Sequence, residues 1–168
     1  MTEPADWINK LNLIPHPEGG FYREFYRSDL VINSGKHDGF FPDGRCASTA
    51  IYYLLKSSDI SAFHRIKSDE IWHFHCGSSL TIHIIDESNG EYSNLILGGG
   101  SDSDQHLSAV VKKGLWFAAG VNEPDSYVLA GCTVSPGFDF MDFELGQRSI
   151  LSDKFPQYRD LIYKFTSK

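Results

Sequence analysis

Alternation of apolar and polar residues dominates the chain between residues 21 and 145 and predicts a series of short β-strands. Residues 49–55 are apolar or aromatic on both alternating faces, which is typical of a central strand buried on two sides. The other predicted strands are residues 21–27, 62–64, 70–76, 80–85, 94–97, 109–111, 115–119, 127–134 and 138–145. Short strands that recur every 8–12 residues or so indicate an all-β sandwich or barrel.

Helical periodicity occurs only near the two ends of the chain. A short helix is predicted over residues 6–12, because Trp7, Ile8 and Leu11 share one face. A second helix is predicted over residues 155–165. No linker, internal repeat or low-complexity segment interrupts the pattern, so we expect a single domain that spans residues 1–168.

Composition and charge narrow the class of protein. The formal net charge of −7 argues against a nucleic-acid-binding protein, because phosphate contacts need clustered lysine and arginine. No run approaches the roughly 18 apolar residues that span a bilayer, so we expect no membrane contact. The 3 cysteines are widely spaced, which favours reduced thiols. Because the first residues also lack the pattern of a signal peptide, a cytoplasmic protein is predicted.

The candidate chemistry is concentrated in residues 62–77, where His64 and Glu70 flank a predicted turn between adjacent strands. Both side chains are predicted to point into the mouth of the barrel and to act as catalytic groups. Strand alternation places Trp72 and Phe74 on the same face as Glu70, so we expect both to contact a ligand there. A carboxyl group against an indole in an apolar cavity has a raised pKa, which suits general acid–base catalysis.

Two other interpretations of these residues stay open. His64 and Glu70 could ligate a divalent metal, but a metal site normally needs three or four converging donors, so we expect no metal cofactor. Alternatively, Trp72 and Phe74 are ordinary core residues, and His64 and Glu70 form a hydrogen-bonded pair that shapes the pocket.

The spacing of His64, Glu70 and Gly77 resembles the later part of the first cupin motif. In that motif a second histidine occurs where this chain has Ile66. The best match to the second cupin motif keeps its glycine at Gly114, whereas Phe117 replaces the metal-binding histidine. We take Phe117 as a further candidate ligand contact.

Five ordered blocks resemble a narrower family, cupin-5, which is also known as domain of unknown function 985. These blocks are Pro15–Gly20, Ser48–Leu55, Phe63–Arg65, Asp69–Phe74 and Gly131–Phe138. The resemblance implies a jelly-roll barrel (a double-stranded β-helix) with a small-molecule pocket, commonly assembled as a homodimer. Short helices at the two ends of the chain would complete this fold.

The cupin resemblance implies a further candidate, because in cupin-type sugar epimerases a tyrosine can serve as an acid opposite a histidine base. Alternation places Thr49 and Tyr53 on one face of their strand and Ser48 and Tyr52 on the other, and the sequence alone does not choose between the two faces. We take Tyr53 as the candidate catalytic acid and Thr49 as a candidate ligand contact.

These observations predict a protein that binds a small polar metabolite, sugar-like or anionic, in a barrel. The preferred activity is that of an isomerase or epimerase that uses His64, Glu70 and Tyr53 in acid–base catalysis. The alternatives are a metal-dependent oxygenase or isomerase and a non-catalytic, ligand-binding dimer.

Overall fold

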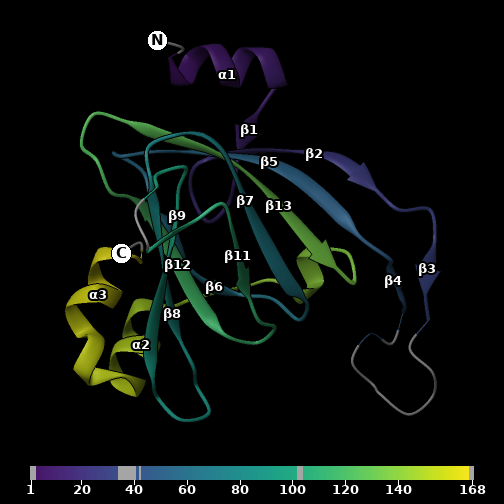
Figure 1. Ribbon diagram of the computed structural model, residues 1–168. Helices are drawn as coiled ribbons and strands as arrows, with labels where there is room; N and C mark the ends of the chain where they lie inside the picture. Colours follow the sequence, from purple (N-terminus) through teal and green to yellow (C-terminus); the bar gives the residue numbers. More distant parts are fainter. Residues whose placement is uncertain (1–2, 34–40, 42, 102–103, 167–168) are drawn as a thin grey trace.

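Two six-stranded sheets face each other in the computed structural model, which describes residues 3–33, 41, 43–101 and 104–166 (Figure 1). The first sheet contains, in spatial order, β1 (Ile14–Pro15), β2 (Phe21–Arg27), β5 (Thr49–Lys56), β13 (Tyr127–Ser135), β7 (Asp69–Gly77) and β11 (Ser108–Val111). The second sheet contains β10 (Gln105–His106), β9 (Tyr92–Leu97), β8 (Leu80–Ile85), β12 (Trp116–Val121), β6 (Ser61–Arg65) and β14 (Glu144–Leu145). A small ribbon of β3 (Val31–Ile32) and β4 (Arg45–Cys46) projects from one side.

The central position predicted for residues 49–55 is confirmed, because β5 lies between β2 and β13 and has apolar contacts on both faces. Its inward residues Tyr53 and Leu55 belong to the core between the two sheets. Its outward residue Leu54 packs instead with Leu13 and with helix α1 (Pro4–Leu11), which covers this end of the first sheet. Burial on both faces therefore explains why this strand carries no polar alternation.

The N-terminal helix is confirmed, but the C-terminal segment differs from the single helix predicted over residues 155–165. It forms α2 (Arg148–Lys154), the 3₁₀ turn η2 (Pro156–Tyr158) and α3 (Arg159–Lys164). Pro156 separates the two helices because it has no amide hydrogen to continue α2. Both helices cover the outer face of the second sheet through a second apolar cluster (Figure 1). None of the described helices has the length and hydropathy needed to span a membrane.

The strand predicted over residues 138–145 is wrong except at its end. Phe140–Asp142 forms the 3₁₀ turn η1, and strand pairing with β6 is limited to β14. The Asp139 carboxylate accepts a hydrogen bond from the Met141 amide and so stabilises the turn. The alternating phenylalanines here pack against one another and against His16, so their spacing reflects a folded loop. This loop forms one wall of the cavity described below.

The predicted all-β jelly-roll with short terminal helices is confirmed. Its two sheets leave a hollow at the end where β5 begins and β13 ends, and the candidate residues gather there.

Candidate functional site

A cavity of about 300 Å³ opens between the two sheets, within the size range of small-molecule sites. Strands contribute Tyr22, Glu24, Arg27, Thr49, Ile51, Tyr53, His64, Glu70, Trp72, Cys132 and Val134 to its wall. The segments between strands contribute His16, Glu18, Ile66, Phe138, Asp139 and Phe140. Since both sheets supply residues, segments far apart in the sequence meet in one site.

Five of the predicted site residues line this cavity: Thr49, Tyr53, His64, Glu70 and Trp72. Phe117 lies beside them, on the strand that pairs with β6, and its ring centre is 4.0 Å from that of His64. Phe74 is not among the lining residues. Phe74 lies two residues beyond Trp72 on β7 and packs against the core, because β7 runs away from the cavity after Glu70 and Trp72.

His64 and Glu18 form a buried polar contact in the cavity wall, with 2% and 8% of their surfaces exposed. The His64 Nε2 atom lies 3.2 Å from Glu18 Oε2, and its Nδ1 atom lies 2.7 Å from the carbonyl oxygen of Ala62. A carbonyl oxygen only accepts, so Nδ1 carries a hydrogen. Nε2 and a carboxylate oxygen are then two acceptors in contact, which is stable only if one proton lies between them. The pair therefore shares a single, movable proton.

A glycine turn places Glu18 in this position. The turn is closed by hydrogen bonds from the Gly19 amide to the His16 carbonyl and from the His16 amide to the Gly20 carbonyl. Gly19 has a φ of +114°, and an added Cβ would overlap the carbonyl oxygen of Ile60, so only glycine fits. The Ser61 hydroxyl then donates to Glu18 Oε1 over 2.8 Å and fixes the carboxylate.

Tyr53 supports the same turn, because its hydroxyl donates to the Gly19 carbonyl over 2.8 Å. Burial raises the pKa of the Tyr53 hydroxyl well above its ordinary value, and the nearby Glu18 carboxyl acts in the same direction. The hydroxyl thus remains a hydrogen-bond donor.

His16 completes this side of the cavity as a neutral ring. Burial lowers the pKa of His16, although the adjacent Glu18 opposes the effect. Its Nδ1 atom accepts the amide hydrogen of Glu18 at 3.3 Å, and its ring meets the ring of Tyr22 edge to face at 4.5 Å. Sequence reasoning did not select His16 or Glu18, although both lie in the Pro15–Gly20 block.

Glu70 lies on β7 in the first sheet, whereas His64 lies on β6 in the second sheet. The surroundings of Glu70 differ from those of Glu18. Burial raises its pKa to about 8, with a further increase from the Glu18 carboxyl and a decrease from a hydrogen bond with the Cys132 thiol. Near neutral pH most molecules therefore hold Glu70 as an undissociated acid. The neighbouring Trp72 is 1% exposed, and its indole N–H has no hydrogen-bond partner among the described residues.

The raised pKa of Glu70 predicts that stability decreases with pH. Between the ordinary value of 4.5 and about 8, the folded state holds one more proton than the unfolded state, so the free energy of unfolding falls. This stabilising contribution is complete below pH 4.5 and is lost as the pH rises through about 8. Urea unfolding at pH 5, 6.5 and 8 should show a steeper decline for the wild type than for Glu70→Gln. If the stabilities of the two proteins declined in parallel with pH, this would contradict a raised pKa of Glu70.

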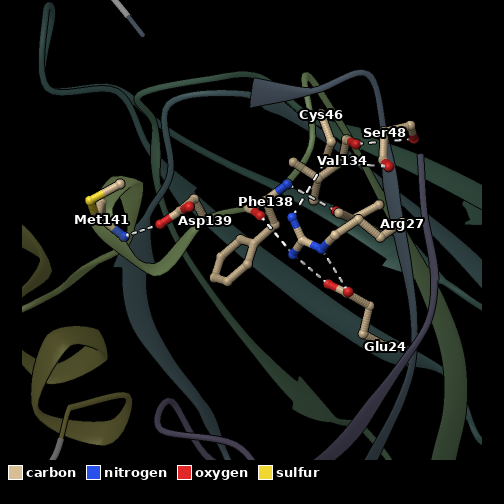
Figure 2. Close-up of polar contacts among 9 residues, drawn as sticks. Glu24, Arg27, Cys46, Ser48, Val134, Phe138, Asp139 and Met141 are labelled. Atoms are coloured by element: carbon tan, nitrogen blue, oxygen red, sulfur yellow. Dashed lines mark hydrogen bonds and ion pairs between the residues drawn. The ribbon is translucent and has the colours of Figure 1, made fainter. Parts of the chain in front are cut away.

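An arginine that sequence reasoning also missed lines the cavity, and Figure 2 shows its polar contacts. Arg27 Nε and Nη2 donate to the two carboxylate oxygens of Glu24 over 2.9 and 2.8 Å. Nη2 also donates to the Phe138 carbonyl over 3.1 Å, and Nη1 contacts Cys46 Sγ at 3.4 Å. Arg27 therefore ties β2 to the loop after β13 and is itself paired.

The residues present do not fit the metal centre that a cupin fold implies. Ile66 and Phe117 occupy positions where the cupin motifs have histidines, and the two remaining donors are bonded elsewhere: His64 to Glu18, and Glu70 to Cys132. Within residues 3–33, 41, 43–101 and 104–166, no three His, Cys, Asp or Glu side chains are grouped so that they could hold a metal ion.

A jelly-roll with one polar cavity between its sheets defines a cupin-type protein, and comparison with known proteins agrees. The family described as cupin superfamily, domain of unknown function 985, matches residues 5–146. The chain therefore belongs to this family, as the sequence blocks predicted.

Two solved structures resemble the chain along nearly its whole length. A protein from Shewanella oneidensis is 37% identical, with a TM-score of 0.89 and 99% of each chain covered. A hypothetical protein from Leishmania major is 31% identical, also with a TM-score of 0.89, and covers 99% of this chain and 100% of its own.

More distant structures share the fold alone. Oxalate decarboxylase from Bacillus subtilis is 16% identical with a TM-score of 0.55, and the match covers 92% of this chain but only 37% of the enzyme. A comparison with curated proteins found no significant match.

Proposed function

We propose that this protein binds a small polar metabolite in the cavity and catalyses isomerisation or epimerisation by proton transfer. The observation that supports this proposal is that two proton-exchanging groups line the same cavity. The His64–Glu18 contact shares one proton, and Glu70 has a pKa of about 8. Glu70 suits this role because a general acid or base acts best when its pKa lies near the working pH, and the buried His64–Glu18 contact is sheltered from water.

In this proposal the ionised fraction of Glu70 takes the proton from a carbon next to a carbonyl group. The proton shared by His64 and Glu18 moves to the carbonyl oxygen, which gives an enediol and leaves the pair without its shared proton. Glu70 then returns its proton to the same or to a neighbouring carbon, and an enediol hydroxyl gives its proton back to the His64–Glu18 pair, which yields the epimer or isomer and restores both groups. Tyr53 takes no part in the exchange here. It holds the Gly19 carbonyl and so positions Glu18.

Solvent exchange tests the proposal without knowledge of the natural substrate. The protein is incubated in D₂O with a set of small hydroxyaldehydes and hydroxyketones, and loss of the α-proton signal is followed by NMR. We expect exchange with at least one member, and loss of this exchange in Glu70→Gln. Glu123→Gln is the matched control, because Glu123 is exposed in the turn before β13, at the far end of that strand from Val134. Absence of exchange with every member, or its persistence in Glu70→Gln, would refute the proposal.

We also propose that the protein is a homodimer that uses the outer edge of the first sheet. β1 pairs only with Phe21 and Tyr22, so the remainder of β2 has no strand on its outer side among the described residues. Phe25 and Tyr26 on this segment are 53% and 50% exposed. An open edge with exposed aromatic rings is a favourable surface for pairing with a second copy. Analytical ultracentrifugation should find a species of twice 18.9 kDa that Phe25→Asp converts to monomer. A wild type that sediments only as a monomer would refute the dimer.

A cytoplasmic location is proposed as well, supported by the free thiols of Cys46, Cys76 and Cys132, a state that reducing compartments maintain. Recovery of the protein from a secreted fraction of the producing cells would contradict it.

A further inference from the structure

The charges of ionisable groups around the cavity are offset by their neighbours. The first of these groups is Arg27, the only arginine in the cavity wall among the described residues. The two carboxylate oxygens of Glu24 occupy Nε and Nη2 of Arg27, and the Phe138 carbonyl and the Cys46 sulfur take further contacts. All three guanidinium nitrogens are thus engaged. A ligand carboxylate or phosphate that takes the bidentate pair of hydrogen bonds from Nε and Nη2 would have to displace Glu24, which would leave that carboxylate without its partner.

The histidines add no free positive charge. His64 and Glu18 together hold one proton at their contact, so the pair is neutral whichever atom carries that proton. His16 accepts the Glu18 amide hydrogen on Nδ1, which requires an unprotonated nitrogen. The imidazoles therefore offer no uncompensated charge to an anion.

The inner wall is uncharged as well. Glu70 is 8% exposed, forms no ion pair among the described residues, and lies against the Cys132 thiol. Its carboxyl group is consequently neutral for most of the time near pH 7. Asp139 is the remaining acidic residue of the wall, and it lies in the partly exposed loop where it caps η1. An ammonium group deep in the cavity would find no uncompensated carboxylate there.

Hydrogen-bonding groups, in contrast, are abundant. The carboxyl oxygens of Glu18 and Glu24 can accept hydrogen bonds from ligand hydroxyls. The indole N–H of Trp72 is a buried donor without a partner in the described chain, and such a donor is costly to leave unsatisfied.

We propose that the ligand of this cavity is an uncharged, polyhydroxylated carbonyl compound, and that the Glu24–Arg27 pair excludes carboxylate- and phosphate-bearing analogues. This deepens the proposed function, on which it rests, by naming the substrate class of the same site. Exclusion follows because an anion would lose its hydration without gaining a counter-charge. The net charge of −7 on the whole chain acts in the same direction.

Matched ligands test the selectivity. Isothermal titration would compare neutral aldoses and ketoses of three to six carbons with the acid, phosphate and amino derivatives of the same skeletons. We expect at least one neutral compound to bind about tenfold or more tightly than its charged derivatives, a difference of about 1.4 kcal/mol. Tighter binding of any acid, phosphate or amine, or failure of every neutral compound to bind, would overturn the inference.

The variant Glu24→Gln tests the cause of the selectivity. Removing this carboxylate frees Arg27, so the acid and phosphate derivatives should gain about tenfold or more in affinity while the neutral ligand changes little. Glu123→Gln removes the same charge far from the cavity and should leave all affinities unchanged. An equal gain in both variants would mean that net charge alone sets the preference, which would contradict a role for Arg27.

The test of ligand selectivity and the test of α-proton exchange can fail separately. If neutral compounds bind selectively but no α-proton exchanges in D₂O, the proposed catalysis is wrong and the ligand class stands. If exchange occurs fastest with an anionic compound, the catalysis stands and the ligand class is wrong.

Discussion

Replacing His64 with glutamine is expected to slow α-proton exchange by about 10²–10⁴-fold, the usual contribution of a positioned general acid. Glutamine has a similar size and keeps a polar group near Glu18, but it cannot hold the movable proton that the imidazole shares with that carboxylate. Solvent exchange followed by NMR in D₂O would measure the effect, with ligand affinity determined in parallel.

His106→Gln is the matched control, since His106 is exposed on β10 and lies outside the cavity wall. It should exchange protons at the wild-type rate. A His64→Gln protein that binds the ligand normally and still exchanges at the wild-type rate would show that the His64–Glu18 contact is structural.

Replacing Arg45 with methionine is expected to lower the free energy of unfolding by up to about 3–5 kcal/mol, because it leaves the buried Asp142 carboxylate with Lys67 as its remaining ion-pair partner. Arg45 Nε and Nη2 donate to the two oxygens of Asp142 over 2.6 and 3.0 Å, and both residues are 8% exposed. This ion pair fastens the loop after β13, which forms a wall of the cavity, to β4. Urea unfolding monitored by tryptophan fluorescence would measure the loss.

The comparison for Arg45→Met is Lys112→Met, which breaks the exposed ion pair with Asp69 and should cost at most about 1 kcal/mol. The double variant Arg45→Met/Asp142→Leu should recover much of the lost stability, because it removes the buried charge and the partner that it leaves, Lys67, is about half exposed. Equal losses of stability in Arg45→Met and Lys112→Met would show that burial of the Arg45–Asp142 pair does not matter.

Much of the candidate site could be predicted from sequence because its strands follow simple alternation. Glu70 and Trp72 are two residues apart on β7 and so share a face, and Thr49 and Tyr53 share a face of β5 in the same way. His64 on β6 and Glu70 on β7 both line the cavity, and a short turn joins these two strands, which belong to different sheets.

The residues that were missed come from segments without periodicity. His16 and Glu18 lie in a turn, whose geometry depends on the positive φ of Gly19 and on a contact with Tyr53. Arg27 lies at the end of an edge strand, where a bulge between Glu24 and Tyr26 shifts the alternation. The glycines and the conspicuous Pro15–Gly20 block were the available signals for Glu18.

By itself, the sequence determined most of the longer segments that become strands, that both faces of residues 49–55 are buried, and which family the chain belongs to. These properties follow from local alternation and from ordered motifs. Only the tertiary structure decided that Glu18 meets His64, that Arg27 is neutralised by Glu24, and that the phenylalanines of residues 138–143 fold as a loop. Such contacts join residues from separate strands and turns, and their geometry depends on sheet pairing, which no local pattern contains.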